Sequence, residues 1–116
     1  MSRYQHLPIY KKTYELLTRS MVAIKTFPRE YKFTLGQKIQ EEVVELVVLI
    51  YRANSMRDKE LFIDQILERV QVIGLLIRLS QDMRILQKKH YASMVEMTES
   101  ISRQAQGWRK VSRISK

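Results

Sequence analysis

The chain has 116 residues, which is enough for one hydrophobic core and too few for two, and its net charge is +9. The absence of cysteine excludes disulfides, thiolate metal sites and cysteine nucleophiles, and the lack of a signal peptide or of the roughly 20 apolar residues that span a bilayer predicts a cytoplasmic protein. Only three glycines and two prolines occur, too few for the turns of a strand-rich fold, so the composition predicts an all-α protein.

The first predicted helix covers residues 8–26. Pro8 fits the first helical turn, where its missing N–H has no partner, and Pro28 ends the helix by pushing the residue before it out of the helical region. Apolar residues at spacings of four and three predict the buried face: Tyr10, Tyr14, Leu17, Met21 and Ile24. The basic residues of this segment fall off that stripe and are expected to face outward.

The second predicted helix, residues 35–54, contains the most apolar stretch of the chain. Thr34-x-x-Gln37 matches a capping box, so the helix is expected to begin near Leu35. Its core stripe is Ile39, Val43, Leu46 and Ile50. Eight of the nine residues at 43–51 are apolar, so this helix is expected to be covered on most sides. A strand is the alternative for VVELVVLIY, but the flanking helical periodicity argues against it.

The third predicted helix, residues 57–83, starts at an N-cap formed by Ser55-x-x-Asp58. Its stripe is Phe62, Ile66, Val70, Ile73 and Ile77, and a second apolar line is Val72, Leu76, Leu79 and Met83. Gly74 costs about 1 kcal/mol relative to alanine inside a helix, so a close backbone approach is expected there.

The fourth predicted helix, residues 88–107, follows a turn near 84–87. Its face is Tyr91, Met94, Thr98, Ile101, Ala105 and Trp108. The alternative is one unbroken helix from Asp58 onward, as in a coiled coil. The basic tail, residues 109–116, is expected to fray.

Four amphipathic helices joined by short turns predict an up-down-up-down four-helix bundle that forms a single domain over residues 1–116. The second and third helices carry more apolar surface than one core needs. Self-association would cover this surplus.

The basic residues are concentrated at the two ends of the chain. Residues 1–32 and 85–116 each hold seven basic and two acidic residues, whereas residues 33–84 hold seven basic and eight acidic ones. This pattern predicts a surface for a polyanion, and nucleic acid fits better than a membrane because no basic helix has a lipid-facing apolar side of its own. The alternative is a basic protein without a charged partner. The candidate contacts are Lys11, Lys12, Arg19, Arg78, Arg84, Lys88, Lys89, Arg103, Arg109, Lys110 and Arg113.

Residues typical of catalysis or metal binding do not form a known pattern. His6 and His90 are too far apart for a metal pair on one helix, and both are expected on the surface. The cluster Glu41, Glu42 and Glu45 is explained by the positive end of a helix dipole. No phosphate-binding loop, dinucleotide fingerprint or nucleophile elbow occurs, so no enzyme activity, cofactor or metal is expected.

Two residues allow both a functional and a structural interpretation. Arg78 interrupts the run LLIRLS, where it either contacts a phosphate or partner protein or forms an ion pair with Asp82 one turn later. Trp108 either stacks on a base or belongs to the core, and its helical spacing favours the core.

Three stretches occur in a distinctive order along nearly the whole chain: FPREYKFTLGQ after an aromatic-rich first helix, LLIRLSQDMRILQKKHY across the third turn, and QGWRK at the end of the fourth helix. With these stretches the chain resembles the accessory variability determinant (Avd) family of diversity-generating retroelements. Related four-helix-bundle proteins encoded in ribosomal-RNA intervening sequences share the FPRE turn and are the alternative, together with a purely structural oligomer of unknown role.

The resemblance implies a bundle that assembles into a five-subunit barrel with a basic surface. Such a protein binds the reverse transcriptase of the retroelement and its template RNA or DNA, and it supports mutagenic complementary DNA synthesis and retrohoming without catalysing a step. The matching basic positions are Arg78 in LLIRLS and Arg109 and Lys110 in QGWRK.

Overall fold

The computed structural model describes residues 4–114, most of which belong to four long helices. These are α1 (Pro8–Ile24), α3 (Gln37–Ser55), α4 (Glu60–Asp82) and α5 (Lys88–Ile114). Shorter elements are the 3-10 helix η1 (Tyr4–His6), the helix α2 (Arg29–Tyr31) and the π-helical segment η2 (Lys32–Gly36). No strand occurs between residues 4 and 114, and no helix in this range is long and apolar enough to cross a membrane.

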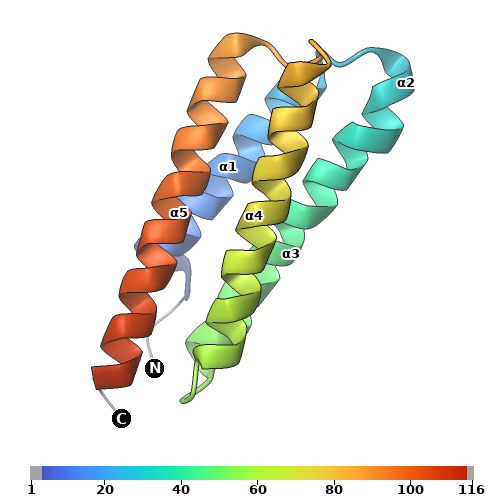
Figure 1. The fold of residues 1–116 in the computed structure, drawn as a ribbon. Coiled ribbons are helices and arrows are strands. Elements are labelled where there is room, and N and C mark those ends of the chain that lie inside the picture. Colours follow the sequence, from blue (N-terminus) through green and yellow to red (C-terminus); the bar gives the residue numbers. More distant parts are fainter. Residues whose placement is uncertain (1–3, 115–116) are drawn as a thin grey trace.

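The four long helices alternate in direction and form a slender bundle of 48 × 20 × 20 Å (Figure 1). Each helix packs against two neighbours, in the cyclic order α1, α3, α4, α5 and back to α1. The helices α1 and α4 therefore lie at opposite corners of the bundle. This arrangement confirms the predicted all-α, up-down-up-down architecture.

The buried faces of α3, α4 and α5 largely follow the predicted stripes. All four stripe residues of α3 are buried, and on α4 only Phe62 remains partly exposed. On α5, Met94, Ile101 and Ala105 are buried, whereas Trp108 packs against the core from its edge. Hydrophobic periodicity was sufficient here because each stripe contains almost only apolar residues.

The buried face predicted for α1 is only partly right, because Tyr10 and Leu17 pack against the core but remain partly exposed. The helix buries Ile9, Thr13, Leu16, Ser20, Ala23 and Ile24, whereas Tyr14 and Met21 are 53% and 48% exposed. Only Ile24 belongs to both sets, because the true face is turned by about 100° from the predicted one. The hydroxyl groups of Thr13 and Ser20 donate hydrogen bonds to the carbonyls of Ile9 and Leu16, at 2.8 and 2.7 Å, and so can be buried without loss.

The start of the second predicted helix also differs. Helical structure begins at Arg29, directly after Pro28, and passes through η2 into α3. The Thr34 hydroxyl donates to the carbonyl of Glu30 at 3.1 Å, and the Gln37 amide donates to the Glu41 carboxylate, so the predicted capping box does not form.

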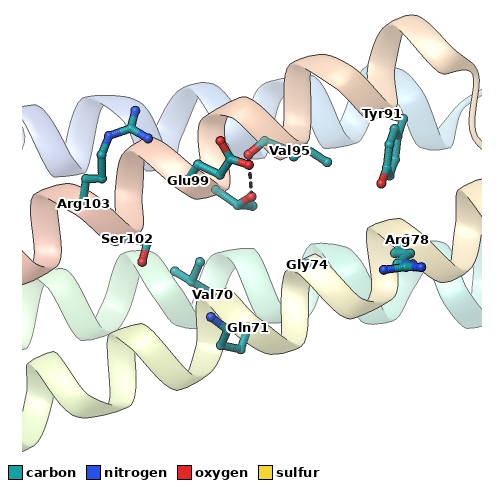
Figure 2. A pocket seen from close by; sticks show the side chains of 10 residues that line it. Val70, Gln71, Gly74, Arg78, Tyr91, Val95, Glu99, Ser102 and Arg103 are labelled. Carbon is teal, nitrogen blue, oxygen red and sulfur yellow. Dashed lines mark hydrogen bonds between the residues drawn. The ribbon is translucent and has the colours of Figure 1, made fainter.

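A close approach to the backbone occurs at Gly36 instead of Gly74. A Cβ atom at Gly36 would lie 2.7 Å from the Cγ2 atom of Ile24, so only glycine fits beside the end of α1. A Cβ atom at Gly74 would meet nothing within 4 Å. Gly74 instead lines an open groove of about 450 Å³ between α4 and α5 (Figure 2).

The turn between α3 and α4 begins and ends differently from the prediction. The Ser55 hydroxyl donates to the carbonyl of Arg52, so Ser55 closes α3 rather than capping the next helix. The helix α4 begins at Glu60, whose backbone N–H donates to the Asp58 carboxylate at 3.2 Å.

The helices α4 and α5 are separated by a turn over residues 83–87, which confirms the predicted break and excludes one unbroken helix. Arg84 adopts a left-handed conformation in this turn, with φ of 59°. The helix α5 then continues to Ile114. The predicted helix end at residue 107 and the predicted fraying of residues 109–114 are therefore wrong. Residues 115–116 of the predicted tail lie outside the described range.

Candidate nucleic-acid interface

The basic ends of the chain meet in the bundle because α1 and α5 are neighbours (Figure 1). Together these two helices contain nine basic and three acidic residues, a net charge of +6. The helices α3 and α4 contain four basic and seven acidic residues, a net charge of −3. The fold therefore separates charge into a basic half and an acidic half.

One side of the basic half presents cations along its length. Lys12 and Glu15 of α1 and Glu96 and Arg103 of α5 line a polar recess of about 180 Å³ between the two helices. Four basic residues on this side define a surface that we call the basic face: Arg19, Lys89, Arg103 and Lys110. On α5 it covers 22 residues, so its two ends lie about 31 Å apart along the helix.

Three of these side chains are exposed, and Arg19 is partly buried. Lys88 and Lys89 lie in the first turn of α5, where unpaired backbone N–H groups add partial positive charge. Lys12 is held 3.1 Å from the Glu15 carboxylate, and Lys11 lies on the outer edge of α1. The arrangement can neutralise several phosphates of one strand at the same time.

Two candidate contacts, Arg109 and Arg113, form ion pairs with carboxylates of α4. The Arg109 guanidinium contacts the carboxylates of Asp64 and Glu60, and Arg113 contacts Glu60, with an Nη2–Oε2 distance of 3.2 Å. These ion pairs attach the last turns of α5 to the start of α4. They explain why the helix continues beyond residue 107.

The candidates Arg78 and Arg84 lie away from the basic face, on α4 and in the following turn. The Arg78 Nε atom is 3.9 Å from the Asp82 carboxylate, and both side chains are largely exposed. Such a pair stabilises by a few tenths of a kcal/mol. Figure 2 shows Arg78 and Tyr91 on opposite walls of the groove between α4 and α5.

Trp108 is held by its neighbours and is not presented for stacking on a base. The Lys59 Nζ atom lies 5.5 Å from the centre of its ring, and the indole packs against the core. The Lys59 ammonium also donates to the carbonyl of Ala53 at 2.8 Å, and partial burial lowers its pKa. The core interpretation of Trp108 is therefore the one that the structure supports.

His90, expected on the surface, is buried near the basic face. Its Nδ1 atom has no hydrogen-bond partner among the described residues. Burial lowers the pKa of His90, and the positive charges of Lys89 and Arg19 lower it further. A spacing of four residues to Met94 was the sequence signal that placed position 90 on the inner face.

The protein is expected to lose stability as the pH falls below about 6.5, the ordinary pKa of histidine. The folded protein binds a proton on His90 less tightly than the unfolded chain does. The stability is therefore fully present above the unfolded pKa and is lost as the pH falls through the lower, folded value. Urea unfolding at about pH 7.5 and about pH 5.5 measures the effect. His90→Leu should reduce the difference in unfolding free energy between the two pH values, whereas His6→Gln, at an exposed position, should leave it unchanged. An equal difference in the wild type and both variants would contradict this prediction.

Glu41 and Glu42 of the predicted acidic cluster make different contacts. Glu42 is buried and forms an ion pair with Arg69 of α4, with an Nη1–Oε1 distance of 2.6 Å. Glu41 accepts a hydrogen bond from Gln37 on the surface. Within residues 4–114 no three histidine or carboxylate side chains converge on a site that could hold a metal ion.

A known protein family matches nearly the whole described chain. A family model described as bAvd-like matches residues 7–112. No protein with a curated description matches the chain.

Proposed function

The chain belongs to the bAvd-like family, and from this premise we propose that it is a non-catalytic accessory protein of a diversity-generating retroelement. In this role it binds nucleic acid and the reverse transcriptase of the element and supports mutagenic complementary DNA synthesis and retrohoming. The family membership supports the assignment to a retroelement, and the charge distribution suggests which surface binds the nucleic acid.

The observation that carries the proposal is the basic face on α1 and α5. Its cations come from both ends of the chain and lie on two neighbouring helices of the bundle. Side chains of this type contact phosphate oxygens and carry little sequence information. A protein with this surface holds a nucleic-acid strand in place, while the partner polymerase performs the chemistry.

Self-association belongs to the same proposal, and a five-subunit ring is the form that we expect. Thirteen large apolar side chains of the described residues are exposed in the single subunit, among them Leu75 and Tyr51. An assembly would cover part of this surface and repeat the basic face around its circumference. Several weak phosphate contacts would then act together on one long nucleic acid.

The proposal is tested by the salt dependence of binding to a short single-stranded RNA, measured by fluorescence anisotropy. If the four cations of the basic face each neutralise one phosphate, the logarithm of the affinity should fall with the logarithm of the salt concentration with a slope of about −3. Absence of binding at low salt would contradict the proposal and favour the alternative of a structural oligomer, whereas an affinity that does not change with salt would contradict phosphate contacts by the basic face. Co-purification with the reverse transcriptase of the retroelement tests the second partner.

A further inference from the structure

The outermost residues of α1 form a stripe with apolar and neutral residues in its centre and a lysine at each end. Its five residues follow at spacings of three, four, three and four, so they lie on one side of the helix. They are Lys11, Tyr14, Thr18, Met21 and Lys25, all exposed. We call this set the α1 stripe. No residue in it takes part in the core, although Tyr14 and Met21 were predicted to be buried.

The outermost residues of α4 form a matching stripe with acidic ends. These residues are Glu68, Val72, Leu75, Leu79 and Asp82, at spacings of four, three, four and three. All are exposed except Val72, which is partly buried, and Leu75 is 66% exposed. We call this set the α4 stripe. Its apolar centre is the surplus surface that a single subunit cannot cover.

The two stripes are complementary in length, direction and charge. Each covers 15 residues, so its two ends lie about 21 Å apart along the helix. The helices α1 and α4 run in the same direction at opposite corners of the bundle (Figure 1). A neighbour whose long axis points the same way, turned about that axis until the stripes face each other, therefore brings its α4 stripe next to the α1 stripe, with both helices parallel.

We propose that a second copy of this chain packs its α4 stripe on the α1 stripe. Leu75 and Leu79 of one copy cover Tyr14 and Met21 of the next, as apolar residues do in a seam between two helices. The charged ends pair as Lys11 with Glu68 and Lys25 with Asp82. Among the described residues Glu68, Lys11 and Lys25 have no ion-pair partner in their own subunit.

This contact uses two different surfaces, so each copy offers one stripe to each of two neighbours. A contact of this kind closes into a ring or continues as a filament. The basic face lies on the adjacent side of α1 and remains open in every copy. The inference rests on the self-association in the proposed function and specifies the surfaces that produce it.

The test uses two variants that each remove one stripe. Tyr14→Lys with Met21→Lys removes the α1 stripe, and Leu75→Lys with Leu79→Lys removes the α4 stripe. All four positions are exposed in the subunit, so both variants should retain the helical circular dichroism of the wild type. Native mass spectrometry should find a multisubunit wild type and each variant alone as a monomer.

A 1:1 mixture of the two variants gives the decisive result. One variant keeps its α4 stripe and the other keeps its α1 stripe, so the mixture should form a 1:1 heterodimer and nothing larger. Val22→Lys and Gln65→Lys, at exposed positions beside the stripes, serve as matched controls and should keep the wild-type mass.

Other outcomes overturn the inference in distinguishable ways. If either variant alone keeps the wild-type mass, or if the mixture stays monomeric, the subunits use other surfaces. A variant without the α4 stripe that forms a homodimer would show that α1 packs on itself. If the wild type is a monomer, self-association is wrong, while RNA binding by the basic face still tests the rest of the proposed function.

Discussion

Replacing Arg69 with alanine is expected to lower the free energy of unfolding by about 3 kcal/mol. The substitution leaves the Glu42 carboxylate, which is only 6% exposed, without the guanidinium that contacts it at 2.6 Å. The hydrogen bond to Glu42 also raises the pKa of Arg69, so the pair stabilises the charged form of the arginine. The remaining cation near Glu42 is the exposed Lys38, 3.6 Å away, which cannot replace a buried contact. Urea unfolding followed by circular dichroism measures the change.

Two control variants separate the buried pair from a general loss of charge. Lys38→Ala removes a cation near the same carboxylate from the surface and should cost less than about 1 kcal/mol. The double variant Glu42→Met with Arg69→Met should recover most of the stability, because the buried charge is removed together with its partner. If Arg69→Ala costs no more than Lys38→Ala, the Glu42 carboxylate does not depend on its arginine.

Replacing all four cations of the basic face with glutamine is expected to weaken RNA binding on the order of 100-fold at about 0.15 M salt. Each lost phosphate contact removes about 0.7 from the salt slope for a single strand, so four contacts account for both the weaker binding and a nearly flat salt dependence. The variant is Arg19→Gln, Lys89→Gln, Arg103→Gln and Lys110→Gln. Fluorescence anisotropy with the same single-stranded RNA measures the loss.

A matched variant with the same change in net charge serves as the control. It replaces with glutamine four basic residues that lie on α2, η2 and α3 and in the turn after α3, away from the basic face: Arg29, Lys32, Arg52 and Arg57. This control should bind RNA within a few-fold of the wild type. Equal losses in both variants would mean that net charge alone drives binding and that the basic face has no special position.

Much of the fold was predictable because α3 and α4 each carry a nearly pure apolar stripe. Where every inward position is a large aliphatic residue, periodicity alone identifies the face, as for Leu46 and Ile73. The turn at residues 83–87 was also predictable, although no glycine or proline marks it.

The failures on α1 and α5 have two different causes, one within the helix and one in a neighbouring helix. Thr13 and Ser20 are buried because their hydroxyl groups are satisfied within α1, which lets the larger Tyr14 and Met21 remain outside. The end of α5 depends on Glu60 and Asp64 of another helix. Hydrophobic periodicity alone reveals neither the hydroxyl groups that are satisfied within a helix nor the carboxylates of another helix.

The candidate site shows the same division. The sequence determined that both ends of the chain are basic and that the helices carry more apolar surface than one core can bury. Only the tertiary structure decided which cations lie together, since the cyclic order of the helices makes α1 and α5 neighbours and pairs Arg109 and Arg113 with carboxylates of α4. It likewise decided which of two apolar stripes on α1 faces the core. The physical reason is that residue type and periodicity act along one helix, whereas burial and charge pairing depend on the neighbour that each helix face meets.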